Sequence, residues 1–319
     1  MPNTANLIPL IDFRLFTNGN TTERQAIVAE FYRACHDIGF IYLKNHSVPK
    51  PLIEELFAQA KYFFDLETSA KQQIAWSSEV GNRGYVGFGR EQLDPGGSTD
   101  LKEAFNVGIE LDSAQIAEHS QALITNQWPS ELPDFRETVL EFYQTCTQAS
   151  LEILRAFATA LDLPETFFDD KHNPGDNTLR LLHYPASAVA ADTEQIRAGV
   201  HSDYGSITLL FQDEVGGLEV CTTWGEWIRA PYIPDTIVVN TGDLMQRWTN
   251  DVFVSTKHRV VSPAGPSALR SRYSVAFFCH PNTDTVVTCL PSCQNSDRPA
   301  LHPPIQAGEY LSSRLQATY

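Results

Sequence analysis

The chain has 319 residues, a length at which β-rich enzymes still fold as a single unit. Its 23 Lys and Arg residues are outnumbered by 39 Asp and Glu residues, which gives a formal net charge of −16, and the basic residues form no block. A negative field opposes binding to a phosphate backbone, so the composition argues against a nucleic-acid polymer as partner. No segment approaches the roughly 20 apolar residues that span a bilayer, so we expect no membrane partner. The sequence predicts no oligomeric state.

The six cysteines form neither a CxxC pair nor a compact framework, and the first residues lack the basic and apolar regions of a secretory signal. We therefore expect a cytoplasmic protein with reduced thiols. Disulfide pairing or metal binding by Cys289 and Cys293 is the less favoured interpretation, because no histidine lies close to them in the sequence.

The N-terminal part is expected to be rich in helices. In chain order, the pattern predicts a short strand at 8–13, an amphipathic helix at 22–38 that ends before Gly39, a buried strand at 40–43 and a second helix after Pro49. These helices are expected to support a β-rich core.

A glycine-rich tract from Gly81 to Gly97 reads as a long loop, which is either a binding lid or a solvated connector. A third long helix is expected from about Pro133 to Leu161, because apolar residues recur there at helical spacing. The segment 307–315 near the end of the chain also reads as a helix.

From Thr178 the pattern changes to short β-rich runs separated by turns. The predicted strands are 179–184, 207–211, 218–221, 226–229, 237–240, 252–261 and 273–279. This set fits a double-stranded β-helix, or jelly roll, in an α+β protein with a mainly β core. We expect a single domain over 1–319, made of a helix-rich part (1–177), a jelly-roll core that carries the chemistry (178–306) and a C-terminal helix (307–319).

Three residues of the β-rich part have the types and spacing of a metal site. His201 and Asp203 are two positions apart, so both side chains project from one face of a strand, and His258 must come from a distant strand. Two imidazoles and one carboxylate leave coordination positions open, as mononuclear Fe(II) requires and a closed zinc site does not. An HxD triplet is weak by itself, so its weight comes from the combination with later residues.

Arg272 and Ser274 are the second part of this pattern, and they also share a strand face. A guanidinium can grip a carboxylate with two hydrogen bonds while the hydroxyl donates a third. The pair therefore suits the distal carboxylate of 2-oxoglutarate.

Alternation along the strands predicts which neighbours face the same way. If the strand through His201 continues regularly, it aims the metal-site residues into the barrel together with Ile207, Leu209 and Phe211. The same rule places Arg272 with Ser274, Ala276 and Phe278, and Arg180 with Leu182 and Tyr184. Tyr184 is then expected to donate its hydroxyl to 2-oxoglutarate, and Arg180 to reach the substrate.

Over nearly its whole length the chain resembles the Fe(II)/2-oxoglutarate-dependent dioxygenases related to isopenicillin N synthase, and within them it is most similar to the fungal thymine 7-hydroxylases. The tracts that carry the resemblance are Ile8–Asp12, Gly39–His46, Asn82–Tyr85, Leu179–Pro185, His201–Asp213, Gly242–Asp243, Ser255–Thr256, His258–Val261, Arg272–Cys279 and Ala317–Tyr319. The resemblance implies a hydroxylase that uses Fe(II), 2-oxoglutarate and O2 and releases succinate and CO2.

The resemblance also matches three residues to positions around a planar substrate. Tyr204 and Phe278 correspond to positions that flank the ring, and Arg180 to one that hydrogen-bonds its carbonyl. In the alternative interpretation, the two aromatic residues belong to the core and Arg180 pairs with an acid. His280 stands where the thymine enzymes usually carry Asn, and the tract 86–100 differs from theirs in sequence and length, so the substrate does not follow directly from the resemblance.

Three other functions stay open at this point. An oxidase or cyclase of the same fold, acting on an amino-acid-derived or secondary metabolite, would need no 2-oxoglutarate. A non-enzymatic barrel would bind a small molecule or store metal, but the intact ligand set argues against it. A zinc hydrolase would need a general base, and none lies beside the ligands in the sequence.

Overall fold

The computed structural model describes residues 7–77, 82–91, 100–110, 125–173, 177–186, 196–262 and 265–316. Its strands are β1 (Leu10–Asp12), β2 (Phe40–Lys44), β3 (Gly84–Val86), β4 (Glu103–Val107), β5 (Thr178–Tyr184), β6 (Ile196–His201), β7 (Ile207–Gln212), β8 (Leu218–Cys221), β9 (Trp227–Arg229), β10 (Thr236–Thr241), β11 (His258–Val261), β12 (Arg272–Cys279), β13 (Val286–Val287) and β14 (Ile305–Gln306). Its helices are α1 (Arg14–Thr17), α2 (Thr21–Asp37), α3 (Lys50–Phe64), α4 (Thr68–Gln73), α6 (Phe135–Ala160), α7 (Asp243–Trp248) and α8 (Ala307–Gln316), with short 3-10 helices η2 (Asp169–Lys171), η3 (Gly265–Leu269) and η4 (Pro291–Cys293).

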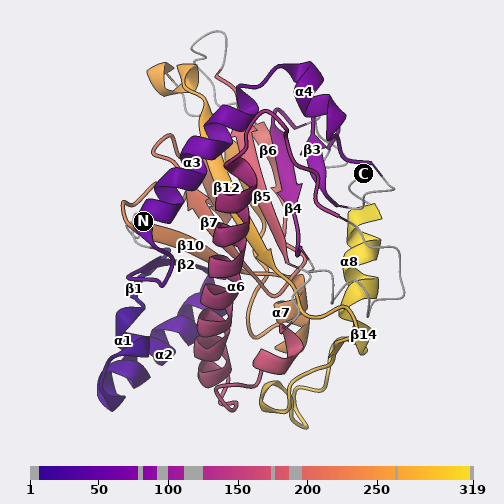
Figure 1. Cartoon of the computed structure of the whole chain (residues 1–319). Coiled ribbons are helices and arrows are strands. Elements are labelled where there is room, and N and C mark those ends of the chain that lie inside the picture. The colour runs from indigo at the N-terminus through magenta and orange to yellow at the C-terminus, as the bar shows by residue number, and fades with distance from the viewer. Residues whose placement is uncertain are drawn as a thin grey trace.

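Two sheets form the centre of the fold (Figure 1). The larger has the strand order β1-β2-β10-β7-β12-β5-β4-β3, and the smaller has the order β6-β11-β8-β9. Strands from both sides of residue 178 therefore share one sheet, with β4 pairing antiparallel to β5 and β2 antiparallel to β10. Within the described residues, no helix combines the length and the apolar character needed to cross a bilayer.

The helices expected at 22–38, after Pro49, at 133–161 and at 307–315 are confirmed as α2, α3, α6 and α8. Helix α2 begins at a capping box, in which the Asn20 side chain accepts from the backbone of Glu23 and the Glu23 carboxylate accepts from the backbone of Asn20. It ends before Gly39, whose φ of 68° belongs to the left-handed region that glycine adopts at no steric cost. A Cβ at Gly39 would also lie 2.2 Å from the Val254 carbonyl oxygen.

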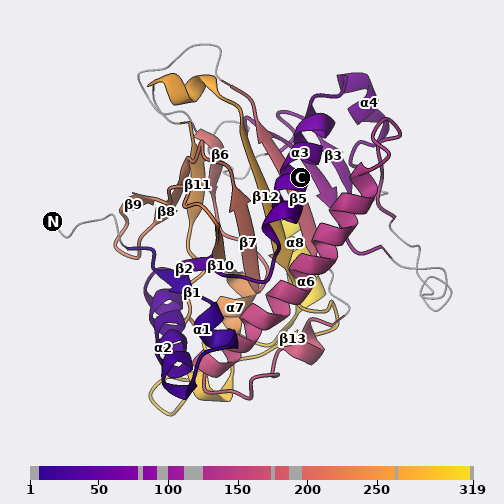
Figure 2. The ribbon, with the colours of Figure 1, turned by 60° about the vertical axis from the view of Figure 1, so that its left-hand side comes forward.

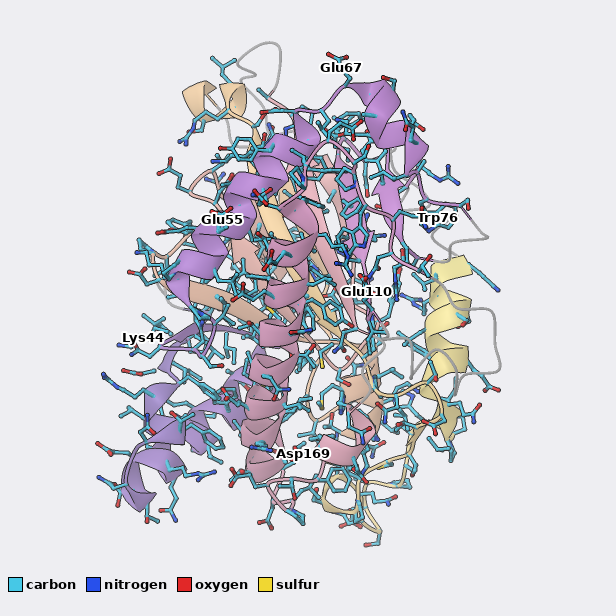
Figure 3. All side chains as sticks on the ribbon, viewed as in Figure 1. Lys44, Glu55, Glu67, Trp76, Glu110 and Asp169 are labelled. Atoms are coloured by element: carbon cyan, nitrogen blue, oxygen red, sulfur yellow. The ribbon has the colours of Figure 1, made fainter. Side chains whose placement is uncertain are left out.

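The long helix α6 covers the outer face of the larger sheet, and α3 packs beside it (Figure 2). Strand alternation produces this arrangement. Ile41 and Leu43 of β2 point toward the helices and join the main core, whereas Phe40 and Tyr42 point between the two sheets. Charged side chains lie on the other face of the helical layer, as Figure 3 shows for the exposed Glu55 of α3.

Three expectations about the strands need correction. The strand predicted at 252–261 is β11 alone, because residues 252–257 form a bend and an irregular connection. The strand β6 was not among the predicted runs. The tract Gly81–Gly97 is not a loop throughout, because it contains β3; residues 81 and 92–97 of that tract lie outside the described residues.

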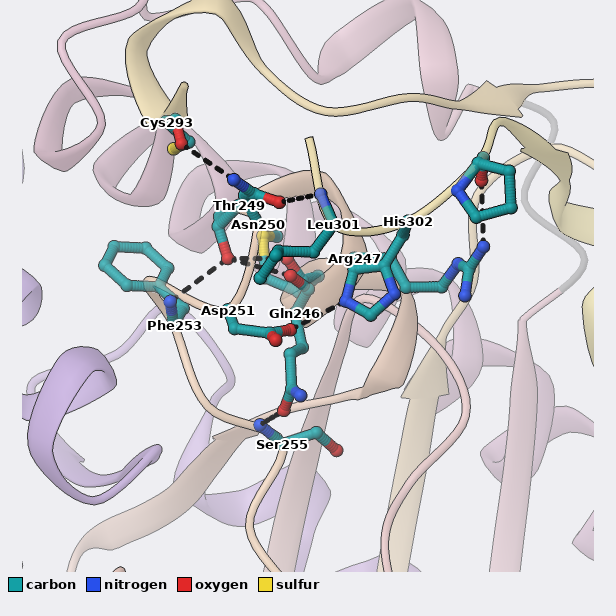
Figure 4. A network of polar contacts seen from close by, with 12 residues as sticks. Gln246, Arg247, Thr249, Asn250, Asp251, Phe253, Ser255, Cys293, Leu301 and His302 are labelled. Carbon is teal, nitrogen blue, oxygen red and sulfur yellow. Dashed lines mark hydrogen bonds and ion pairs between the residues drawn. The ribbon is translucent and has the colours of Figure 1, made fainter. Parts of the chain in front are cut away.

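The turn between α7 and β11 is fixed by side-chain hydrogen bonds (Figure 4). Asn250, at a φ of 53°, donates from Nδ2 to the Cys293 carbonyl oxygen, and its Oδ1 accepts from the Leu301 backbone. The Ser255 backbone donates to Oε1 of Gln246 over 2.5 Å. These bonds tie the approach to β11 to the chain segment that continues into α8.

Phe157 tests the helical layer, because it is buried in α6 with its ring 5.8 Å from the rings of both Phe31 and Phe253. We expect Phe157→Ala to lower the free energy of unfolding by about 3–5 kcal/mol through the cavity that it leaves. Tyr62→Ala, at a position 58% exposed on α3, is the control and should cost under about 0.5 kcal/mol. Denaturant titrations measure both, and equal losses would contradict this account of the core.

Candidate active site

The metal-site residues predicted from the sequence meet at one end of the smaller sheet. His201 is the last residue of β6, His258 is the first residue of β11, and the two are direct partners across the antiparallel pair. One potential ligand atom from each of His201, Asp203 and His258 lies within 4.8 Å of the others. The three side chains are therefore close enough to share one ion.

The expected strand register around Asp203 is wrong. The strand β6 ends at His201, and Asp203 lies in the connection to β7 rather than two positions further along one strand. As a result Ile207, Leu209 and Phe211 face the helical layer, and the side chains of β7 that face inward are Thr208 and Leu210. Asp203 reaches the site from this connection, which packs closely against Gly242. A Cβ at Gly242 would lie 2.3 Å from the Gly205 carbonyl oxygen.

Hydrogen bonds orient both imidazoles for metal binding. Nδ1 of His201 lies 2.8 Å from the Gly199 carbonyl oxygen, and Nδ1 of His258 lies 3.1 Å from that of Thr256. Because a carbonyl oxygen only accepts, each Nδ1 must carry the proton, which leaves the Nε2 lone pair for a metal. Nε2 of His258 is 3.7 Å from Oδ1 of Asp203. The atoms therefore converge in the way that a 2-His-1-carboxylate site for Fe(II) requires.

The electrostatics of the cluster favour the metal-binding protonation states. Burial, with His258 close by, lowers the pKa of His201 to about 3, so its imidazole is neutral. Burial by itself raises the pKa of the Asp203 carboxyl, but the two histidines and hydrogen bonds more than offset this and hold it below its ordinary value. The bonds come to Oδ2 from Thr208 over 2.6 Å and from Asn240 over 2.8 Å.

The cluster opens into a cavity of about 880 Å³ between the two sheets. All the residues predicted for cosubstrate and substrate line it: Arg180, Tyr184, Tyr204, Arg272, Ser274 and Phe278. The expected facing of Leu182 and Ala276 into the same space is confirmed as well. Helix α8 closes one side through Leu311, Ser312 and Leu315.

Arg272 forms the basic end of the cavity. Its guanidinium is buried, donates from Nη1 to Ser274 Oγ over 2.9 Å and lies 4.9 Å from the centre of the Tyr184 ring. Nε of Arg272 is buried and has no hydrogen-bond partner among the described residues. A buried donor without a partner is costly, so this end of the cavity is suited to an anionic ligand.

The substrate residues predicted by resemblance lie on other parts of the wall. Arg180 donates from Nη2 to Glu91 over 2.5 Å, so it does pair with an acid, as the alternative interpretation expected. Its side chain nevertheless lines the cavity. Phe278 lies nearly parallel to His280, with ring centres 6.4 Å apart. Tyr204 lies beneath the Arg314 guanidinium of α8, which is 4.7 Å from the ring centre.

Several lining or supporting residues were not predicted from the sequence. Lys102 and Arg83 line the cavity, and Thr208 and Asn240 fix the Asp203 carboxylate. Arg83 belongs to a tract that carried the resemblance, which was the available signal for it. The others are single polar residues that belong to no recognisable motif. Thr208 is only five positions from Asp203, but β6 ends between His201 and Asp203, so strand alternation does not reveal the contact.

Comparison with known proteins identifies the class of protein that this site defines. Residues 175–281 match the 2OG-Fe(II) oxygenase superfamily, and residues 8–131 match the family described as non-haem dioxygenase in morphine synthesis N-terminal. The chain belongs to the Fe(II)- and 2-oxoglutarate-dependent oxygenases. It is an oxidoreductase that uses Fe(II), 2-oxoglutarate and O2, and its two sheets form the jelly roll of that fold.

Among its relatives, a 2-oxoglutarate-Fe(II) type oxidoreductase of Emericella nidulans, hxnY, is 34% identical over 98% of this chain and 90% of its own length. The proline hydroxylase buaE of Petromyces alliaceus is 36% identical over 97% of this chain and 98% of its own. The structure of Neurospora crassa thymine 7-hydroxylase with alpha-KG and thymine superposes with a TM-score of 0.86 at 36% identity, covering 98% of this chain and 97% of that one.

The buried imidazole of His172, beside the site, makes the free energy of unfolding depend on pH. Burial lowers the pKa of its imidazole to about 4, and its nitrogens lie 2.9 Å from Ser206 Oγ and from the Phe168 carbonyl oxygen. As the pH falls, the unfolded chain binds this proton before the folded chain does. The contribution of the neutral His172 imidazole to the free energy of unfolding is therefore complete above about pH 6.5 and is lost as the pH falls toward 4. The loss amounts to about 3 kcal/mol.

We therefore expect the free energy of unfolding of wild-type protein to fall more steeply between pH 6.5 and pH 4 than that of His172→Gln. Denaturant titrations at several pH values give both slopes. Trp224→Gln, at a position 56% exposed, removes no titratable group; it is the control and should keep the wild-type slope. Parallel curves for wild type and His172→Gln would refute the role of the buried imidazole.

Proposed function

We propose that this oxygenase hydroxylates a small, planar, thymine-like heterocycle, within a single domain. The observation that carries the proposal is the shared cavity, which joins the His201–Asp203–His258 cluster to a buried guanidinium at one end and to aromatic side chains elsewhere. Similarity to the Neurospora thymine 7-hydroxylase in complex with thymine supports the substrate class.

In this proposal His201, Asp203 and His258 would hold Fe(II), which when bound would activate O2. O2 is the oxidant: it takes two electrons from 2-oxoglutarate, which gives succinate and CO2, and two from the substrate C–H bond, and one oxygen atom enters succinate while the other enters the new hydroxyl group. Arg272, Ser274 and Tyr184 hold the distal carboxylate. Nε of Arg272 has no partner among the described residues and can donate to this carboxylate, and the Tyr184 ring lies at the same buried end. These residues align the cosubstrate and exclude water from the ion pair between Arg272 and the distal carboxylate.

Arg180, Tyr204 and Phe278 orient the substrate. A flat ring packs favourably against aromatic faces, and a guanidinium supplies donors to ring carbonyls that have lost their water. Helix α8 covers this region, because Arg314 packs on Tyr204 and Tyr310 donates to Asp243 over 2.8 Å. By enclosing the substrate, the helix keeps the reacting C–H bond in a fixed place.

A second candidate is an amino-acid-derived substrate, which the similarity to a proline hydroxylase favours. His280 also lines the cavity, at the position where the thymine enzymes usually carry Asn. A substrate panel that includes both thymine and proline separates the two candidates.

His201→Ala should reduce succinate release from 2-oxoglutarate to background, because two of the three ligands do not hold the metal in a productive position. The assay mixes protein, Fe(II), 2-oxoglutarate and thymine and measures succinate. His36→Ala, which changes an exposed histidine, should retain the wild-type rate. Full turnover by His201→Ala would eliminate the assignment.

Thymine should shift the metal-to-ligand charge-transfer band of the anaerobic Fe(II)–2-oxoglutarate complex. Phe278→Ala should weaken the apparent affinity for thymine by up to about tenfold through lost ring contact, and should leave the affinity for 2-oxoglutarate unchanged. Trp224→Ala, at an exposed position, is the control. If no pyrimidine shifts the band and proline does, the thymine-like substrate is replaced by the amino acid.

A further inference from the structure

A line of buried polar contacts connects the substrate wall with a metal ligand. At its outer end, Glu91 accepts from Arg180 over 2.5 Å, and the same carboxylate oxygen lies 3.5 Å from Nζ of Lys102. Lys102 also pairs with Asp100. Two acids and two bases therefore form a compact cluster in which the charges cancel.

At its inner end, the cluster contacts the strand that carries His201. Oδ1 of Asp100 accepts from the Gly199 backbone N–H over 2.9 Å. The carbonyl oxygen of the same residue, Gly199, accepts from Nδ1 of His201 over 2.8 Å. Asp100 and the His201 imidazole thus bind the two backbone polar groups of a single glycine.

The cluster is buried to a degree that charged side chains reach only when they are paired. The side chains of Glu91, Lys102 and Asp100 are 3%, 4% and 2% exposed, and that of Arg180 is 13% exposed. Burying four charges is unfavourable unless the pairing geometry is fixed. Replacing one member therefore disturbs the positions of the others.

We infer that Glu91, Asp100 and Lys102 are positioning residues, which fix β6 at Gly199, and so the His201 imidazole, relative to the substrate-facing Arg180. Hydrogen-bonded partners behind metal ligands set ligand orientation and affinity. The role of Arg180 toward substrate rests on the proposed function. The link to the metal does not, so it is tested without any substrate.

Binding of Co(II), a spectroscopic substitute for Fe(II), to the metal-free protein tests the inference through its absorption bands. Asp100→Ala should weaken Co(II) binding by about tenfold. Asp100→Asn should recover part of that loss, because its amide oxygen still accepts from the Gly199 N–H. Glu91→Gln should weaken binding in the same direction but by less, because it acts through Lys102.

Glu103→Gln is the matched control. Glu103 directly follows Lys102, is 2% exposed and pairs with Lys71, but it does not line the cavity. We expect this variant to lose thermal stability, as the Asp100 variants do, and to bind Co(II) with wild-type affinity.

Equal Co(II) affinity in wild type and Asp100→Ala would overturn the inference, and so would an equal loss in Glu103→Gln, which would show that general destabilisation is the cause. Absence of Co(II) binding by wild type would overturn the metal site and the inference together. Because thymine is absent from the experiment, a wrong substrate assignment leaves the result unaffected.

Discussion

The site depends on one buried carboxylate that the larger sheet holds and that faces the smaller sheet. Oδ2 of Asp203 receives hydrogen bonds from Thr208 of β7 and Asn240 of β10 in the larger sheet, while Oδ1 faces His258 of the smaller one. A buried carboxylate is unfavourable without such donors. The two bonds fix one oxygen and leave the other directed at the imidazole, so the relative position of the sheets becomes the geometry of the metal site.

Strand alternation lets the same strands build the core and the site. The outward side chains of β12 (Val275, Phe277 and Cys279) join the apolar layer beneath the helices, and the inward ones line the cavity with Arg272 and Ser274. The burial of apolar side chains on the outer face thus offsets the unfavourable free energy of burying charged groups on the inner face. A change of register by one residue would exchange the two sets.

The sequence was sufficient where strands are regular. Arg272, Ser274 and Phe278 face the cavity as alternation predicts, because β12 runs without a bulge through its pairings with β5 and β7. Alternation failed after His201, since the chain leaves β6 there and begins β7 only at Ile207, which resets the parity. The Glu91–Arg180 pair joins residues 89 positions apart, and no local pattern encodes a contact at that separation.

Charge compensation around the cavity separates the two proposed ligands. The protein is strongly acidic, yet Arg180, Lys102 and Arg272 all line the cavity. Arg180 and Lys102 are compensated by Glu91 and Asp100, so an additional anion there would compete with carboxylates already in place. Arg272 hydrogen-bonds only the neutral hydroxyl of Ser274 among the described contacts, and it gains most from a carboxylate. This asymmetry favours a keto acid at the Arg272 end and an uncharged ring at the Arg180 end.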